Sequence, residues 1–199
     1  MQIGVFGGTF NPIHRGHIRL CETAKEQLVL DRVLMIPAGM PPHKIPPELA
    51  SGQDRAEMCR IAAAGRPWLT VDERELRAAG KNYTVDTLAS LAADYPEDAF
   101  TLIIGSDMLT TFHQWREYRR ILSICRIGAL CRSVVEQEAF ADAAERLRKE
   151  GGRIEKLTVP PMEVSSTQIR QWIKTEPSRA AALLPEGVAE YIMTRGLYR

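Results

Sequence analysis

The chain has 199 residues and a mass of 22.3 kDa, and the usual scaling of protein surfaces allows about 70 % of its unfolded surface to be buried, enough for a self-sufficient core. Hydrophobic residues make up 45 % of the chain and charged residues 26 %, which excludes a disordered, collagenous or coiled-coil protein. The formal net charge is only +1, so no bulk field holds nucleic acid or an anionic membrane, and any anion must be bound locally. We therefore expect a globular protein with neither kind of partner.

The start of the chain and its cysteines predict a cytoplasmic protein. Residues 1–6 pass directly into an apolar strand pattern, without the basic region and long apolar segment of a signal peptide. No apolar run approaches the roughly twenty residues needed to cross a bilayer. The widely spaced cysteines contain no CxxC pair, so we expect reduced thiols at Cys21, Cys59, Cys125 and Cys131.

In chain order, the first predicted elements are a short apolar strand at 3–6, a helix at 17–30 and a buried-type strand at 32–36. A long loop at 37–53 follows, because proline interrupts both helices and strand ladders and this segment contains Pro37, Pro41, Pro42, Pro46 and Pro47. A loop of that length within a compact domain is usually functional or disordered.

The alternation of strands and helices continues to the end of the chain. The expected elements are a helix at 53–64, a strand at 68–72, a helix at 84–94, a strand at 100–104, short helices within 107–122, a strand at 125–131, a helix at 136–150, a strand at 153–159 and helices at 165–174 and 186–195. Near-continuous apolar strands alternating with helices predict an α/β fold, a doubly wound parallel sheet with helices on both faces. We expect one domain over 1–199, with a small helical part at about 165–199.

The loop from Gly7 to His17 has the features of an anion-binding site. Its two glycines let the backbone approach a ligand closely and expose amide groups. The helix that follows adds unpaired N–H groups and the positive end of its dipole. His14 and His17 are three residues apart, so both imidazoles can face one ligand, and a nearby phosphate favours their charged form.

Three other interpretations of this loop fit less well. A dinucleotide-binding fingerprint needs G-x-G-x-x-G, whereas the glycines here are Gly4, Gly7 and Gly8. A Walker loop needs Gly-Lys-Ser/Thr, which is absent from the sequence. A zinc site at His14 and His17 lacks further ligands at a recognisable spacing. The sequence therefore favours phosphate binding.

A second candidate phosphate site begins at Ser165. Ser165 and Gln168 fit a capping box, and a well-capped helix alone would explain both. Capping does not explain three consecutive hydroxyls, Ser165 to Thr167, followed by Arg170 on the first turn. Oriented N–H groups, hydroxyls and a guanidinium together can bind phosphate.

A third candidate is Gly105-Ser106-Asp107, which follows the strongest predicted strand. In a doubly wound order this strand lies beside the first, and the Asp107 carboxylate can bind a ribose hydroxyl, a metal or a basic side chain there. The local sequence supports equally well that Asp107 caps the following helix. By default, Trp115 belongs to the core and Lys44 is a solvated surface charge.

Together these motifs resemble the HxGH nucleotidyltransferase superfamily, through Gly7 to His17 with its His14-x-x-His17 spacing and through Ser165-Ser166-Thr167-x-Ile169-Arg170. Three further blocks narrow the resemblance to the nicotinate-nucleotide adenylyltransferases: Pro41-Pro42-His43-Lys44, Tyr83-Thr84-Val85-Asp86-Thr87-Leu88, and Gly105-Ser106-Asp107 with Phe112-x-x-Trp115. The resemblance implies a Rossmann-like nucleotidyltransferase fold.

The resemblance also implies transfer of AMP from ATP, accompanied by Mg²⁺, to nicotinate mononucleotide, which gives deamido-NAD and pyrophosphate in NAD biosynthesis. It implies catalytic roles for His14, His17 and Arg170. The implied ATP contacts are Gly8, Thr9, Phe10, His14, His17, Gly105, Asp107, Ser165, Thr167 and Arg170. The implied mononucleotide contacts are Lys44, Tyr83, Thr84, Asp107 and Trp115, with the pyridine carboxylate at the start of the Tyr83-Thr84 helix and Trp115 stacked on the ring.

Two residues depart from the family pattern. Asn11 stands where many relatives have Asp, and because an amide lacks the charge we place no metal there. Asn82 stands where Ser is common.

The remaining alternatives are another HxGH transferase, such as a pantetheine-phosphate adenylyltransferase or a cytidylyltransferase, a non-catalytic nucleotide sensor, and a nicotinamide-dependent oxidoreductase. The sequence leaves open whether the chain forms a homo-oligomer and how strictly it prefers the nicotinate form.

Overall fold

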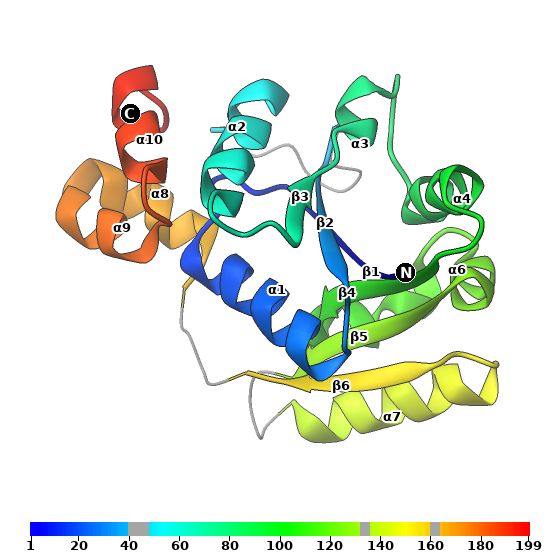
Figure 1. Cartoon of the computed structure of the whole chain (residues 1–199). Coiled ribbons are helices and arrows are strands. Elements are labelled where there is room, and N and C mark those ends of the chain that lie inside the picture. The colour runs from blue at the N-terminus through cyan, green and yellow to red at the C-terminus, as the bar shows by residue number, and fades with distance from the viewer. Residues whose placement is uncertain (40–47, 132–135, 160–163) are drawn as a thin grey trace. The chain divides into compact units, whose positions relative to one another are not determined.

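A computed structural model describes residues 1–39, 48–131, 136–159 and 164–199. Six strands form one sheet in the order β3-β2-β1-β4-β5-β6 (Figure 1). The strands are β1 (Gln2–Gly8), β2 (Arg32–Pro37), β3 (Leu69–Val71), β4 (Ala99–Gly105), β5 (Cys125–Cys131) and β6 (Ile154–Thr158). The pairings of β1 with β4, β4 with β5 and β5 with β6 are parallel. This strand order reverses direction at β1, as in a doubly wound dinucleotide-type fold, and confirms the predicted fold class.

The helices connect these strands. They are α1 (Arg15–Gln27), α2 (Gly52–Ala63), α3 (Arg74–Arg77), α4 (Thr84–Asp94), α5 (Ser106–Thr110), the 3₁₀ helix η1 (Phe112–Gln114), α6 (Tyr118–Ile124), α7 (Gln137–Lys149), α8 (Ser166–Thr175), α9 (Pro177–Leu183) and α10 (Val188–Arg195). In the described part of the chain, no helix combines the length and apolar character needed to cross a membrane.

The chain divides into two compact units. The first comprises Met1–Gly7, Leu20–Leu34 and Tyr83–Pro161, and the second comprises Gly8–Arg19, Met35–Asn82 and Met162–Arg199. The expected single domain over 1–199 stays a prediction.

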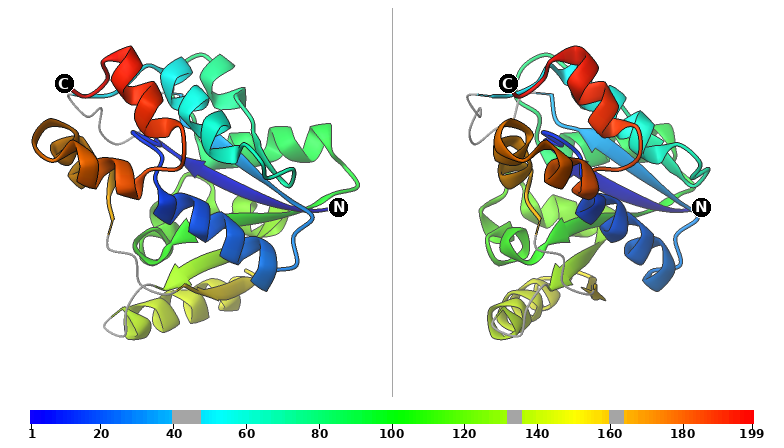
Figure 2. Two further views of the ribbon diagram at one scale, coloured as in Figure 1. Left: turned by 60° about the vertical axis from the view of Figure 1, so that its left-hand side comes forward. Right: turned by 90° about the vertical axis from the view of Figure 1, so that its left-hand side faces the viewer.

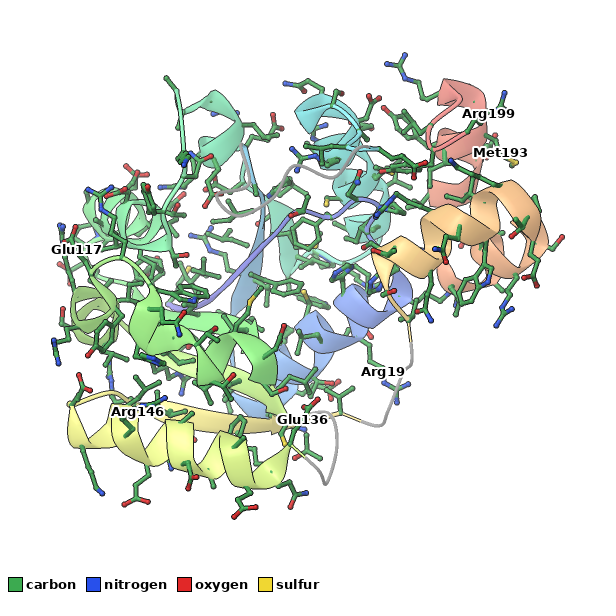
Figure 3. The ribbon with its side chains drawn as sticks, turned by 180° about the vertical axis from the view of Figure 1, so that it is seen from behind. Arg19, Glu117, Glu136, Arg146, Met193 and Arg199 are labelled. Carbon is green, nitrogen blue, oxygen red and sulfur yellow. The ribbon has the colours of Figure 1, made fainter. Side chains whose placement is uncertain are left out.

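The first unit is built on β1, β4, β5 and β6. Residues 100–104 of β4 are all buried, which is why this stretch of the sequence is apolar apart from Thr101. Helix α7 runs alongside β6 (Figure 1). Its buried face consists of Phe140, Ala143, Ala144 and Leu147. Seen from behind, Glu136 lies at the start of α7 and Arg146 farther along the helix (Figure 3). The Ser106 hydroxyl donates to Glu136 Oε2 at 2.5 Å, and Arg146 Nη2 donates to the Thr110 carbonyl at 3.4 Å, so both residues tie α7 to α5.

The second unit contains the helical part predicted for the C-terminus, which consists of α8, α9 and α10. Helix α10 lies beside α2 in each view (Figure 2). The Asp54 carboxylate of α2 accepts a hydrogen bond from the Tyr191 hydroxyl at 2.9 Å and one from Arg195 Nε at 3.2 Å, which attaches α10 to α2. The same carboxylate bonds the hydroxyl of Ser51, the N-cap of α2, at 2.6 Å.

Three helices differ from the sequence predictions: the end of one was placed too late, and two were not predicted. Helix α1 ends at Gln27 rather than near residue 30, because Val29 has a left-handed φ of 51°. Helix α3 was missed, since a four-residue helix shows no apolar period. Helix α9 was also missed, although Pro177 at its first position is a start signal that the sequence displays. Of the predicted proline-rich loop, residues 40–47 lie outside the described residues.

Candidate active site

The loop after β1 turns sharply between Gly8 and Pro12. Phe10 is buried and has a left-handed φ of 48°, a conformation that costs a residue with a side chain about 1–2 kcal/mol. A Cβ at Gly8 would lie 2.9 Å from the Phe10 ring, so only glycine fits there. The buried Phe10 ring thus requires a glycine at the exit of the strand, which explains part of the glycine pattern.

His14 and His17 lie together at the start of α1. Their rings are stacked, with centroids 3.6 Å apart and planes at 21°. The His14 backbone N–H donates to His17 Nδ1 at 3.1 Å, so Nδ1 is an acceptor and the proton of the neutral His17 ring lies on Nε2. Two charged rings in this arrangement would repel each other unless an anion lay beside them. The pair is therefore suited to a polyanionic ligand.

Gly16, between the two histidines, leaves room for the His14 ring. A Cβ there would lie 2.9 Å from Val164 Cγ1 and 3.1 Å from His14 Nδ1. Both contacts are tighter than side chains normally make, so any larger residue must displace the ring or the chain that leads into α8. The glycine of the His-x-Gly-His pattern thus has a steric reason.

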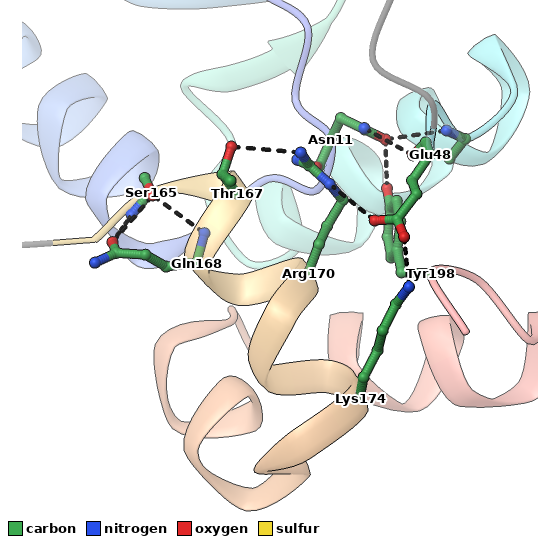
Figure 4. Close-up of polar contacts among 9 residues, drawn as sticks. Asn11, Glu48, Ser165, Thr167, Gln168, Arg170, Lys174 and Tyr198 are labelled. Carbon is green, nitrogen blue, oxygen red and sulfur yellow. Dashed lines mark hydrogen bonds and ion pairs between the residues drawn. The ribbon is translucent and has the colours of Figure 1, made fainter.

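The guanidinium of Arg170, on α8, bonds the backbone of the first loop. Arg170 Nη1 donates to the Asn11 carbonyl at 2.8 Å, and Arg170 Nη2 donates to Thr167 Oγ1 at 3.3 Å (Figure 4). The Ser166 hydroxyl donates to the Pro12 carbonyl at 2.9 Å. The structure therefore brings the two predicted phosphate motifs, which are about 150 residues apart in the chain, to the same loop.

The start of α8 has the capping box that the sequence indicates. Ser165 Oγ accepts from the Gln168 N–H at 3.2 Å, and the Gln168 side chain accepts from the Ser165 N–H at 3.1 Å (Figure 4). The Ser165 hydroxyl is thus used for capping. Ser166, the one hydroxyl of this motif for which the resemblance implies no contact, bonds the first loop.

Asn11 is the centre of a hydrogen-bond network that the sequence did not reveal. Its Oδ1 accepts from the Ala50 N–H at 3.0 Å and from the Tyr198 hydroxyl at 2.8 Å, and its Nδ2 donates to the Glu48 carbonyl at 3.0 Å (Figure 4). An aspartate could not make the last bond, because it has no donor when ionised. The departure from Asp at this position therefore has a structural consequence: the amide binds residues 48–50.

Arg55 of α2 also binds segments around the first loop, although the sequence did not single it out. It is 1 % exposed and donates to the carbonyls of Thr9 at 2.8 Å, Ala50 at 3.2 Å and Gly39 at 3.3 Å. Burial lowers the pKa of this guanidinium, because charge is disfavoured away from water. Arg55 joins three segments around the first loop, and no sequence signal distinguishes it from an exposed helix arginine.

Glu48 connects Arg170 to a further cation. Its carboxylate forms an ion pair with Lys174, and Oε2 lies 3.6 Å from Arg170 Nε (Figure 4). The hydrogen bond from Lys174 lowers the pKa of Glu48, with smaller contributions from Lys174 and Arg170 charges. Glu48 is therefore ionised at neutral pH and contributes to holding the Arg170 side chain in place.

The remaining candidates belong to the first unit. Tyr83 is the N-cap of α4, Thr84 is the first residue of that helix, and the Arg116 guanidinium lies 4.6 Å from the Tyr83 ring centroid. Trp115 is half-buried against Phe112, with ring centroids 5.0 Å apart. The Arg116 guanidinium thus adds a positive charge at the start of α4, which the sequence alone did not reveal.

Asp107 lies in the first turn of α5 and is exposed. The N-cap of α5 is Gly105, so the alternative that Asp107 caps this helix is wrong. Its carboxylate stays a candidate for binding. Lys44 lies outside the described residues. Within the described ranges, no group of three or more His, Cys, Asp or Glu side chains could hold a metal ion.

The comparisons with known proteins agree on one family. The model of the Cytidylyltransferase-like family matches residues 5–172. The chain is 38 % identical to a probable nicotinate-nucleotide adenylyltransferase of Geobacter metallireducens and 40 % identical to that of Syntrophotalea carbinolica, in both cases over 100 % of this chain and 98 % of the relative.

Solved structures give the same fold. The Plasmodium falciparum nicotinic acid mononucleotide adenylyltransferase complexed with NaAD superimposes with a TM-score of 0.81 at 17 % identity, covering 99 % of this chain and 97 % of that one. At such low identity the likeness shows the fold alone. The full-length match to relatives above 30 % identity goes further: the chain belongs to the cytidylyltransferase-like family and, within it, to the nicotinate-nucleotide adenylyltransferases.

Proposed function

We propose that this protein transfers AMP from ATP to nicotinate mononucleotide, forming deamido-NAD and pyrophosphate in NAD biosynthesis. The relatives that match the whole chain carry the name of this activity. The observation that carries the proposal is the 2.8 Å hydrogen bond from Arg170 to the Asn11 carbonyl, because it holds a guanidinium at the loop that leads to His14 and His17. Two imidazoles at the end of this loop and a guanidinium bonded to it from α8 suit a polyphosphate.

The reaction needs positioning and charge stabilisation rather than covalent catalysis. The nucleophile is the phosphate of the mononucleotide, which is already ionised, so no general base is needed. It attacks the α-phosphorus of ATP in line, the bond from that phosphorus to the bridging oxygen breaks, and pyrophosphate leaves. In the proposal, His14, His17 and Arg170 stabilise the negative charge of the transition state, with His17 donating through Nε2.

ATP enters as its Mg²⁺ complex, with the cation bound chiefly by phosphate oxygens, which are the ligands Mg²⁺ prefers. The backbone of Gly8, Thr9 and Phe10 contacts the nucleotide at the turn after β1. Thr167 offers its hydroxyl beside Arg170, and Ser165 contributes through the capped start of α8. Gly105 and Asp107 bind the ribose region.

The mononucleotide is recognised at the start of α4. Its pyridine carboxylate accepts hydrogen bonds from backbone N–H groups at the start of this helix, near Tyr83 and Thr84, and Arg116 adds positive charge. Trp115 stacks on the ring. The family resemblance also implies a contact of the phosphate region with Lys44, which lies outside the described residues. The helix start favours an anion by about 0.3–2 kcal/mol, or roughly 2- to 30-fold, and amide donors leave a carboxamide NH₂ without a partner. We therefore expect the acid form to be preferred.

Pyrophosphate release with ATP and Mg²⁺ tests the proposal. The acceptors are nicotinate mononucleotide, nicotinamide mononucleotide and phosphopantetheine, each also measured without enzyme. We expect turnover with the first, slower turnover with the second and none with the third. Turnover only with phosphopantetheine would identify another HxGH transferase, and ATP binding without any turnover would indicate a nucleotide sensor. Equal kcat/KM for acid and amide would contradict the specificity alone.

The proposal places the reaction in the cytoplasm. In the part of the chain that the structure describes, the four cysteines are buried thiols outside any disulfide, as suits a reducing compartment. The proposal is independent of whether the chain forms a homo-oligomer, which light scattering after size exclusion measures directly.

A further inference from the structure

Tyr198, the penultimate residue, reaches the first loop of the chain. Its side chain is 7 % exposed, and its hydroxyl donates to Asn11 Oδ1 at 2.8 Å although 187 residues separate the two (Figure 4). Its backbone has a left-handed φ of 64°, as does Gly196, the C-cap of α10, two residues earlier. A tyrosine rarely adopts this conformation, so the packing and the hydrogen bond around its ring must maintain it.

The orientation of the Asn11 amide follows from its partners. The Ala50 N–H can only donate, so the atom facing it must be Oδ1, and the other end of the amide then donates to the Glu48 carbonyl. With Oδ1 as the acceptor, the Tyr198 hydroxyl must donate to it. Asn11 is 3 % exposed, so water does not readily replace a lost partner.

Asn11 also carries the atom that anchors Arg170. Its backbone carbonyl accepts from Arg170 Nη1, and Pro12, next in the chain, accepts from Ser166. Any shift of Asn11 therefore moves the anchor of the guanidinium and the chain leading to His14. One hydrogen bond from the C-terminal tail bears on both parts of the proposed triphosphate site.

We propose that Tyr198 is a positioning residue for ATP: its hydroxyl fixes Asn11 and thereby the place at which Arg170 meets the first loop. This inference rests on the proposed function for the identity of the reaction, but not for the binding of ATP. Tyr198 itself is not a catalytic residue, since it acts through Asn11.

The alternative is that Tyr198 only fastens the C-terminal tail. The chain offers a matched control, because Tyr191 of α10 makes the same kind of bond from the same tail. Its hydroxyl donates to Asp54 Oδ1 at 2.9 Å, and none of the hydrogen bonds described for it reaches the first loop. Tyr191→Phe and Tyr198→Phe each remove one hydroxyl from the tail, and only the second removes a partner of Asn11.

The first experiment compares both variants in steady-state kinetics with each substrate varied in turn. We expect Tyr198→Phe to raise the KM for ATP about 3- to 10-fold, the usual effect of one lost hydrogen bond, while the KM for nicotinate mononucleotide changes less than twofold. We expect Tyr191→Phe to leave both within twofold of the parent. Equal effects of the two variants on ATP, or equal changes in both KM values for Tyr198→Phe, would overturn the inference.

The second experiment measures binding of α,β-methylene-ATP with Mg²⁺ by calorimetry, without any acceptor. We expect Tyr198→Phe to weaken binding about 3- to 10-fold, and to have less than a twofold effect when Asn11 is already alanine. Equal effects in both backgrounds would overturn the inference. Because no acceptor is present, this result stands even if turnover of nicotinate mononucleotide fails, and the two failures are distinguishable.

Discussion

Arg170 Nη1 lies 2.8 Å from the carbonyl oxygen of Asn11, although 159 residues separate them in the chain. The bond is directed at the backbone three residues before His14, so it places a permanent positive charge at the loop that carries both histidines. Charge-assisted bonds of this kind are stronger than neutral ones and hold a guanidinium in one orientation. The proposed reaction depends on this relationship.

His17→Ala tests the role of the imidazole pair. We expect kcat to fall about 10²- to 10³-fold, the usual cost of losing one preorganised charge stabiliser. Pyrophosphate release measures the rate, and circular dichroism confirms that the variant is folded. A loss smaller than tenfold would limit His17 to accepting the His14 N–H at the start of α1.

Gly16→Ala tests the steric requirement between the histidines. Alanine is favoured over glycine inside a helix by about 1 kcal/mol, so helix propensity alone predicts a stabilised protein. The new Cβ, however, meets Val164 and His14, and we expect kcat to fall at least about tenfold as the His14 ring is displaced. The measurements are kcat from pyrophosphate release and Tm from thermal unfolding. A variant with a raised Tm and the parent's kcat would contradict the steric argument.

Arg170→Lys tests whether the shape of the guanidinium matters as well as its charge. A single ammonium cannot replace the planar group that contacts Asn11, Thr167 and Glu48, so we expect kcat/KM for ATP to fall about 10- to 100-fold.

Lys174→Ala is the control for this change, because it removes the other cation paired with Glu48 from an exposed position. We expect its kcat/KM for ATP to stay within threefold of the parent. Similar losses in Arg170→Lys and Lys174→Ala would indicate that the Glu48 ion pairs, rather than the guanidinium, matter.

Asp54→Asn tests the attachment of α10 to α2. The hydrogen bond from Ser51, followed by those from Tyr191 and Arg195, lowers the pKa of Asp54 below the unfolded value of about 3.9. A lowered folded-state pKa stabilises the protein above the unfolded pKa, and this stabilisation disappears as pH falls through the folded pKa. We expect the variant to have a Tm lower by about 2–6 °C at pH 7, and the difference to shrink below about pH 4.

The exposed Asp142→Asn change on α7 provides the comparison for Asp54→Asn. Its Tm should follow that of the parent protein at every pH. A Tm difference for Asp54→Asn that stays constant from pH 7 to about pH 3 would show that the carboxylate charge contributes nothing.

Much of the fold could be predicted because its signals are local. The buried runs at 100–104 and 125–131 lie within β4 and β5, and the capping box at Ser165 is formed as its spacing indicates. The family resemblance, carried by the histidine loop and the Arg170 motif, is confirmed by relatives that match the full chain. Helix α3 was not predictable, since four residues are too few to display a period.

The sequence by itself determined the six strands, most of the helices between them, the motifs and the family, because periodicity, capping and loop spacing act between residues a few positions apart. Only the tertiary structure decided the partners of Asn11, which lie 37, 39 and 187 residues away at Glu48, Ala50 and Tyr198. A side chain's hydrogen-bonding capacity is visible in the sequence, but its partners depend on which distant segments packing brings within about 3 Å. The same holds for Arg55 and Arg170, whose charges meet backbone carbonyls that leave no pattern in the sequence.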